Sequence, residues 1–474
     1  MNEILRSSGT RQAQLIRDGE ISSLELVRLH LASIDAINPS INAVVEVLRE
    51  SALRDAAAVD TRRAAGEPMR AFEGVPFSIK DSIQVEGSVC SAGTLGLRNS
   101  PPATEDATLV ARLRAAGAIP LARTNLPDLL FAFETDNLIY GRTSNPYDLS
   151  RTSGGSSGGE AALIAACGSP FGLGSDAAGS VRLPAHYCGI SSIKPTTGRL
   201  SRAGHVPPPG GWIEMLWQIG PMARCVEDLW GMMPVLLGHC RRDRTVIPMP
   251  YGDPAQVSLR DLRIAFFTDN GIATPDDDTL AAIRNAVRQL APEVASMEEC
   301  RPEGIEESYD LEMKFIGPDG GDALRHYLKE IGSVRTHPLL DGWLAKLERW
   351  RTGVDGFAEY WGSLDRFRDR MFTFLDRYDA ILSPVASHPA VPHGTSTEES
   401  IFRGFSYTMT HNLTGWPAAV VRCGTSREGL PIGIQIAAPP WREDIALALA
   451  RAIELFSGPG HYANVLPRCW PIKI

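Results

Sequence analysis

The chain has 474 residues, 43% of them hydrophobic, and is long enough for one large α/β domain or two ordinary ones. Its formal net charge of −9 at pH 7 provides no basic surface for nucleic acid, and no window approaches the roughly 18 uncharged apolar residues of a membrane span. The N-terminal stretch is charged throughout and lacks the apolar core of a signal peptide, so we expect a cytoplasmic protein.

The N-terminal segment is predicted to be helical and then extended. Ser22 and Glu25 have the spacing of a capping box that opens an amphipathic helix, which Asn38-Pro39 is expected to end. Residues 42–47 (NAVVEV) have the composition of a strand, and the Ala- and Arg-rich stretch 51–65 has that of a second helix.

The elements that follow alternate between strand and helix. Residues 74–81 (GVPFSIKD) predict a strand, 107–118 a helix with a glycine stop, and 119–125 a second strand. This order is a βαβ unit, which implies a parallel sheet covered by helices. The alternation continues with a helix at 160–166 and a short strand at 171–176.

The alternation of strand and helix signals becomes weaker from about residue 241 to residue 405. Residues 248–254 and 304–322 look like loops between helices, and a helix at 365–379 leads into a strand at 380–385. The large aromatic residues of this segment stand at helical spacing and are predicted to be core: Trp343, Trp350, Phe357 and Trp361. The sequence again has the pattern of a compact α/β fold in three later segments: 418–424, 433–439 and 443–456.

Two turns rich in small residues are the candidates for chemistry. GGSSGG (154–159) satisfies the G-x-S-x-G pattern of a nucleophile elbow at both Ser156 and Ser157. That elbow requires a strand running directly into it, whereas residues 145–153 are polar and rich in turn formers. We therefore interpret the match as coincidental.

The second turn, GSDAAGS (174–180), ends in Ser180, which we take as the candidate nucleophile. Its Gly and Ala residues leave backbone N–H groups unobstructed, as an oxyanion hole requires. A serine hydroxyl also needs a base, and a lysine kept neutral by burial can serve. Lys80, in the apolar stretch VPFSIKDSI, is the candidate, with its side chain on the opposite face of the strand from Asp81. The alternative is an ordinary lysine at a strand end.

The histidines and cysteines form no recognisable site. His388 and His393 are five residues apart and flanked by prolines, which does not fit a helical metal pair. The remaining later histidines are interpreted as structural residues: His186, His205, His239, His326, His337, His411 and His461. The cysteines contain no CxxC pair and are expected to be reduced and mostly buried: Cys90, Cys167, Cys188, Cys225, Cys240, Cys300, Cys423 and Cys469.

Four ordered blocks of the sequence together resemble the amidase signature family: 74–81, RTSGGSSGGEAALIA (151–165), GLGSDAAGSVRLPAHYCGISSIKPTTGR (172–199) and QIGPMARCVEDL (218–229). The segments 412–421 and 429–436 add to it. The resemblance implies a single α/β domain over 1–474, in which helices cover both faces of a large mixed sheet. It further implies a signature core at about 70–240 and a variable, substrate-shaping segment at about 241–375.

The resemblance also implies the roles of individual residues. The family's triad falls on Lys80, Ser156 and Ser180, with Ser180 as the nucleophile, Ser156 as the proton relay next to a cis peptide, and neutral Lys80 as the base. The family commonly has Gly-Gly where this chain has Ala178-Gly179, so Ala178 would be strained if the turn needed a positive φ there. The oxyanion hole falls on the backbone amides of Ala177, Ala178, Gly179 and Ser180.

The activity implied is hydrolysis of carboxamides, and also of esters or carbamates, through a serine acyl-enzyme without a metal or organic cofactor. The alternative is the glutamine-hydrolysing component of an amidotransferase complex. A homodimer is one assembly that the sequence allows. An apolar or aryl substrate pocket is predicted from four aromatic residues, for which core positions fit equally well: Phe131, Phe133, Tyr140 and Trp212.

Overall fold

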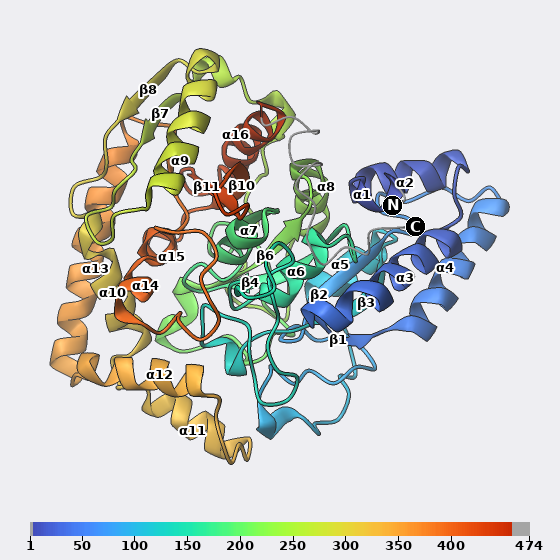
Figure 1. Ribbon diagram of the computed structural model, residues 1–474, viewed down its shortest axis with the longest axis horizontal. Helices are drawn as coiled ribbons and strands as arrows, with labels where there is room; N and C mark the ends of the chain where they lie inside the picture. Colours follow the sequence, from blue (N-terminus) through green and yellow to red (C-terminus); the bar gives the residue numbers. More distant parts are fainter. Residues whose placement is uncertain (1–2, 457–474) are drawn as a thin grey trace.

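The computed structural model describes residues 3–456, and one mixed sheet forms its centre (Figure 1). The eleven strands pair in the order β1-β3-β2-β4-β6-β5-β10-β11-β9-β7-β8. Strand β2 is parallel to β3 and β4, and β7 is parallel to β8 and β9, whereas the other pairs are antiparallel. The strands are β1 (Val44–Val47), β2 (Pro76–Lys80), β3 (Ile119–Thr124), β4 (Phe171–Asp176), β5 (Ser191–Lys194), β6 (Gln218–Ala223), β7 (Arg263–Phe266), β8 (Ser296–Glu299), β9 (Ala380–Pro384), β10 (Ala418–Thr425) and β11 (Pro431–Ala437).

Helices cover both faces of this sheet, as the sequence predicts. Helices α2, α5, α8, α9 and α16 contribute to the apolar core on one face, and α3, α4, α6 and α7 to the core on the other. Helices α10, α13 and α15 pack beside strands β7, β9 and β10 (Figure 1). The helices are α1 (Glu3–Arg6), α2 (Gly9–Asp18), α3 (Ser23–Ile41), α4 (Arg49–Ala64), α5 (Thr108–Ala115), α6 (Gly158–Ala165), α7 (Arg182–Cys188), α8 (Val226–Leu236), α9 (Asp277–Leu290), α10 (Ser308–Ile316), α11 (Asp322–Glu330), α12 (Pro338–Leu347), α13 (Val354–Leu375), α14 (Glu399–Arg403), α15 (Met409–Leu413) and α16 (Glu443–Phe456).

The predicted capping box is present at the start of α3. Ser22 Oγ accepts from the Glu25 N–H at 3.1 Å, and the Ser22 N–H donates to Glu25 Oε2 at 2.9 Å. The predicted end at Asn38-Pro39 is wrong, because the helix continues to Ile41. Pro39 lies in the last turn, where its missing N–H removes only one backbone hydrogen bond, and Asn42 ends the helix in the left-handed conformation with φ 48°.

The predicted βαβ unit is confirmed as β2-α5-β3, with Lys80 in register with Thr124 of the parallel neighbour. The prediction of a loop throughout 304–322 is wrong, because Ser308–Ile316 form α10. Its buried Tyr309, Leu311, Met313 and Phe315 alternate with polar residues in sequence, which hides the helical period. Helix α13 likewise begins at Val354, earlier than the predicted 365.

Strand β2 sends alternate side chains to opposite faces of the sheet. Phe77 and Ile79 belong to the apolar core that includes α5 and α8. Ser78 donates to Glu160 of α6, and the Lys80 side chain lies on the same face as α6. Asp81 follows the strand and pairs with Arg123 at 2.9 Å, with both side chains buried. The alternation therefore separates Lys80 from this neighbouring carboxylate, as predicted.

None of the helices within residues 3–456 combines the length and the apolar character that crossing a bilayer would demand.

Removal of the Asp81 carboxylate should destabilise the fold. Asp81→Ala leaves the Arg123 guanidinium buried without its counter-ion, so we expect the free energy of unfolding to fall by about 3–5 kcal/mol. Guanidinium chloride titration followed by circular dichroism measures this change. The double variant Asp81→Leu/Arg123→Met should regain most of the lost stability, and equal stability of wild type and Asp81→Ala would contradict the proposed importance of the pair.

Candidate active site

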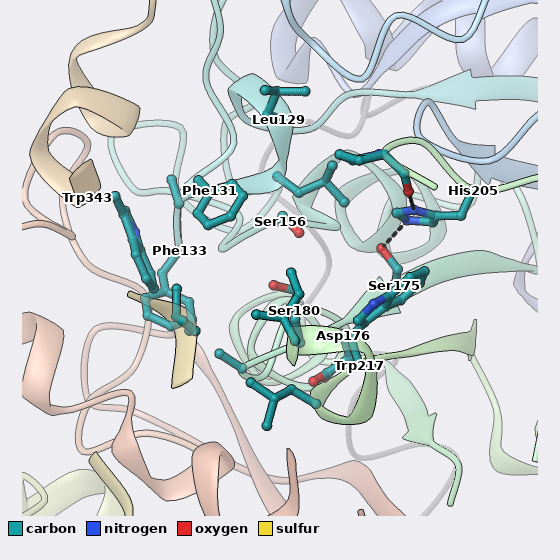
Figure 2. Close-up of a pocket in the computed structure, with 18 of the residues that line it drawn as sticks. Leu129, Phe131, Phe133, Ser156, Ser175, Asp176, Ser180, His205, Trp217 and Trp343 are labelled. Atoms are coloured by element: carbon teal, nitrogen blue, oxygen red, sulfur yellow. Dashed lines mark hydrogen bonds between the residues drawn. The ribbon is translucent and has the colours of Figure 1, made fainter. Parts of the chain in front are cut away.

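The two serine-containing turns lie side by side. GGSSGG leads into α6, and residues 177–181 connect β4 to α7. The Ser157 N–H donates to the Ser180 carbonyl at 3.1 Å, so a backbone hydrogen bond joins one turn to the other. The Gly155–Ser156 peptide bond is cis, as the family resemblance implies. Figure 2 shows Ser156 and Ser180 next to one another in the lining of a pocket.

Lys80 lies behind these serines and is fully buried. Its Nζ is 2.7 Å from Ser156 Oγ, 3.0 Å from Ser157 Oγ and 3.2 Å from Ser175 Oγ. Burial lowers the pKa of Lys80 well below its ordinary value and outweighs the opposing pull of the Asp176 and Glu160 carboxyl groups. The geometry thus places an amine that readily becomes neutral among three hydroxyl groups.

The two nearby carboxyl groups are occupied by other partners. Burial would raise the pKa of Asp176, but the Arg182 guanidinium, 2.8 Å away, outweighs burial and holds that pKa below its usual range. Burial raises the pKa of Glu160 to about 7, and its Oε2 accepts from Thr124 Oγ1 at 2.7 Å. Neither carboxyl group is hydrogen-bonded to Lys80, so no direct ion pair keeps the lysine charged.

The turn before Ser180 presents backbone amides to the pocket. Ala177 and Ala178 line the pocket, and the structure gives their N–H groups and that of Ser180 no hydrogen bond within residues 3–456. The Gly179 N–H, also predicted for the oxyanion hole, already donates to Asp176 Oδ1 at 2.8 Å. The positive φ of the turn falls at Gly179 (120°) and not at Ala178, so the condition for strain at the alanine is not met.

The pocket is mostly apolar, and both Phe131 and Phe133 line it (Figure 2). Trp343 of α12 packs against both rings, with centroids 6.0 and 5.5 Å away. Sequence analysis places Trp343 only in the core, and the residue is indeed buried, yet it also lines the pocket. Other apolar lining comes from Leu129, Leu130, Ala132, Pro207, Pro208, Ile213, Leu216, Trp217 and Ile316.

Two of the predicted aromatic residues do not line this pocket. Tyr140 is not among the residues that line it. Asn137 Oδ1 accepts from the Tyr140 N–H at 2.8 Å, and Asn42 Nδ2 donates to the Tyr140 carbonyl at 2.8 Å. A contact between Tyr140 and a substrate stays a prediction. Trp212 lines an adjoining apolar cavity that shares Phe131 and Ile316 with the pocket.

Two pocket residues are not among the site residues predicted from the sequence: Ser175, and His205, which is interpreted as structural from the sequence. His205 lines the pocket, and its Nε2 lies 3.0 Å from Ser175 Oγ (Figure 2). Ser175 lies in β4, within the predicted small-residue run 174–180 that also contains Ser180, and this shared run is a usable signal. His205 stands in the stretch between the third and fourth signature blocks and belongs to no motif that would mark it.

Within residues 3–456, no cluster of three or more His, Cys, Asp or Glu side chains is arranged to hold a metal ion. The predicted burial of most cysteines holds for Cys90, Cys167, Cys188, Cys240 and Cys423. Cys225 and Cys300 are partly exposed, and Cys469 and His461 lie outside the described residues.

Comparison with known proteins adds independent findings. The family model described as Amidase matches residues 25–447. The chain is 32% identical to the A subunit of glutamyl-tRNA(Gln) amidotransferase from Salinispora arenicola (strain CNS-205), over 97% of this chain and 99% of that protein. It is also 32% identical to an acylamidase of Rhodococcus erythropolis, over 94% of each. Among solved structures, it is similar to a bacterial aryl acylamidase of the amidase signature family, with a TM-score of 0.86 and 25% identity over 98% of each chain.

A side chain at Gly179 should disturb the turn before Ser180. In Gly179→Ala the new Cβ would clash with the Thr408 side chain at a backbone φ of 120°. Since non-glycine residues avoid this conformation, we expect the free energy of unfolding to fall by roughly 1–3 kcal/mol. Ala178→Gly is the matched control and should change stability by less than half as much in the same denaturant titration. Equal effects of the two substitutions would contradict the assignment of the constraint to Gly179.

Proposed function

The chain belongs to the amidase signature family, and from this we propose that it hydrolyses carboxamide C–N bonds through Ser180, Ser156 and Lys80. The observation that carries the proposal is the 2.7 Å distance between Lys80 Nζ and Ser156 Oγ, next to the pocket that Ser180 lines. The burial of Lys80 supports its role as base, because desolvation favours the neutral amine.

In the proposed reaction, neutral Lys80 accepts the proton of Ser156 while Ser156 accepts the proton of Ser180. Ser180 Oγ then forms a bond to the substrate carbonyl carbon, and the carbonyl oxygen gains the negative charge. The N–H groups of Ala177, Ala178 and Ser180 are the donors suited to stabilise this oxyanion. Collapse of the intermediate breaks the C–N bond, and the proton returns through Ser156 to the departing amine. Water then attacks the acyl-enzyme by the same proton path and releases the acid.

The proposed substrates carry an apolar or aryl group beside the amide. Phe131, Phe133 and Trp343 form an aromatic wall opposite the serines, and the neighbouring lining is largely aliphatic. Among the residues that line the pocket, the carboxylate of Asp176 is held by Arg182 and is not available to a substrate cation. Esters and carbamates are also proposed substrates, since attack by Ser180 on their carbonyl groups follows the same course.

The second candidate function is glutamine hydrolysis in an amidotransferase complex, which the similarity to the glutamyl-tRNA(Gln) amidotransferase chain favours. Glutamine carries an ammonium and a carboxylate that need charged partners on the enzyme. The described pocket lining provides no arginine or lysine for that carboxylate. We therefore favour the small-molecule amidase. A hydrolysis screen over aryl amides, aliphatic amides, carbamates, esters and glutamine separates the two candidates, since glutamine as the only substrate turned over would overturn our choice.

Substitution of the nucleophile should abolish turnover. Ser180→Ala removes the oxygen that forms the acyl-enzyme, so we expect no measurable hydrolysis with the fold unchanged. Ser156→Ala should lower kcat by several orders of magnitude but retain some activity, because a water molecule can partly replace the proton relay. A fluorophosphonate probe followed by peptide mass spectrometry locates the reactive oxygen. The label is expected on Ser180, and a label on Ser156 or Ser157 would refute the assignment.

Activity should rise with pH as Lys80 loses its proton. An unperturbed lysine has a pKa of about 10.4. Because burial lowers the pKa of Lys80, the rising limb of the pH profile of kcat/KM on an amide should lie below that pH. Lys80→Ala should remove the limb and reduce amide hydrolysis more than hydrolysis of an activated ester, whose leaving group needs no proton.

Lys194→Met provides the matched control for this pH profile. Lys194 is also fully buried, and burial lowers its pKa to about 7, but its Nζ bonds the Pro195 carbonyl and it does not line the pocket. The rising limb of the pH profile of kcat/KM should be unchanged in Lys194→Met. If the rising limb were lost in Lys194→Met and retained in Lys80→Ala, the assignment of Lys80 as the base would be wrong.

A further inference from the structure

His205 is a buried imidazole whose hydrogen bonds fix its tautomer. It precedes Val206 in the segment between β5 and β6, and its ring packs on Trp217 with centroids 4.6 Å apart. Nδ1 lies 3.1 Å from the Pro207 carbonyl oxygen, which can only accept, so Nδ1 carries the proton. Burial, together with the charges of Lys80 and Arg202, lowers the pKa of His205 to about 3. The ring is therefore neutral, and Nε2 is an acceptor.

This acceptor orients the hydroxyl group of Ser175. His205 Nε2 lies 3.0 Å from Ser175 Oγ and 3.1 Å from Ser82 Oγ, and its single lone pair is shared by these two hydroxyl donors (Figure 2 shows the bond to Ser175). With its proton directed at His205, Ser175 Oγ turns its lone pairs to Lys80 Nζ at 3.2 Å. Ser175 can then accept a hydrogen bond from the lysine but cannot give one to it.

Ser157 is restricted in the same way by a different partner. Its hydroxyl donates to the Ser175 carbonyl at 3.3 Å, so Ser157 Oγ also acts as an acceptor toward Lys80 Nζ at 3.0 Å. A neutral lysine amine has two N–H bonds and one lone pair. Ser157 and Ser175 take up the two N–H bonds. The lone pair is left facing Ser156 Oγ, the nearest of the three hydroxyl oxygens at 2.7 Å.

We propose that His205 is a positioning residue that fixes the Ser175 hydroxyl as an acceptor and thereby aims the lone pair of Lys80 at Ser156. This inference rests on the proposed function, in which Lys80 removes the proton of Ser156. Without the imidazole acceptor, Ser175 is free to turn its proton toward Lys80 Nζ and compete with Ser156 for the lone pair. The charged groups near Lys80 are Asp176 and Glu160, both bonded elsewhere, and those acting on His205 are Lys80 and Arg202.

The test compares two substitutions of His205. His205→Phe keeps a ring against Trp217 but removes the acceptor, whereas His205→Gln places an amide oxygen near the position of Nε2. For His205→Phe we expect kcat on an amide to fall roughly tenfold or more, with KM changed by less than about threefold, because one orienting hydrogen bond is lost. The rising limb of its pH profile should move to lower pH, because a donating Ser175 stabilises the neutral amine. His205→Gln should recover most of the rate and restore the limb.

Ser82→Ala is the matched control, since it removes the other hydroxyl bonded to Nε2 and leaves the Ser175 bond intact. It should behave as the wild type. Should His205→Phe fail to fold, Ser175→Ala provides a second test: it should lose rate, and adding His205→Leu, which also removes the acceptor, should cost nothing further, since His205 acts through Ser175.

Two results would overturn the inference about His205. One is a wild-type rate and pH limb in His205→Phe. The other is a uniform loss of activity at all pH values that His205→Gln does not rescue, which indicates a merely structural role. Lys80→Ala, assayed in parallel, separates this failure from failure of the proposed function. Full activity in Lys80→Ala refutes the function itself, whereas an inactive Lys80→Ala beside an unaffected His205→Phe refutes only the role of His205.

Discussion

The desolvation of one lysine is the constraint on which the site depends. Lys80 ends a strand that has neighbours on both sides and helices over both faces, so its amine is out of contact with water. An ammonium group in such a place would need a carboxylate partner to be stable. The structure surrounds the amine with hydroxyl groups instead. The nearby Asp176 forms an ion pair with Arg182, and Glu160 accepts hydrogen bonds from Ser78 and Thr124. The same burial that is unfavourable to the charged lysine makes the neutral amine available.

Small residues allow the serine turns to approach this lysine. A Cβ on Gly174 would lie 2.7 Å from Ser157 Oγ, so a larger residue in β4 would push α6 and its preceding turn off the sheet. Asp176, at the end of β4, accepts from the N–H groups of Gly179 and Val181 and so shapes the turn that carries Ser180. The parallel neighbours β2 and β4 thus position the candidate base and the turn of the candidate nucleophile from adjacent strand ends.

Local sequence patterns were sufficient for the elements around the site, but not for the pocket wall. The βαβ unit and the capping box of α3 follow from spacing within short windows, and the two serine turns are visible as runs of Gly, Ser and Ala. Trp343 reaches the pocket from a distant part of the chain, and His205 reaches it from a segment without a motif, so only tertiary packing reveals them. Tyr140 is near Phe133 in the sequence but is not part of the pocket lining, and its main chain is bonded to Asn137. The alternation of apolar and polar residues in α10 conceals a helix whose Glu312 is itself buried.

The backbone hydrogen bond from Ser157 to Ser180 is independent of the catalytic candidates' side chains. It joins the two turns at the residue next to Ser156 and at Ser180 itself, and it uses no side-chain atom of either. Truncation of either hydroxyl group therefore leaves the connection between the turns in place. A substitution at Ser156 or Ser180 thus removes an oxygen from the site without removing the main-chain contact that holds the two turns together.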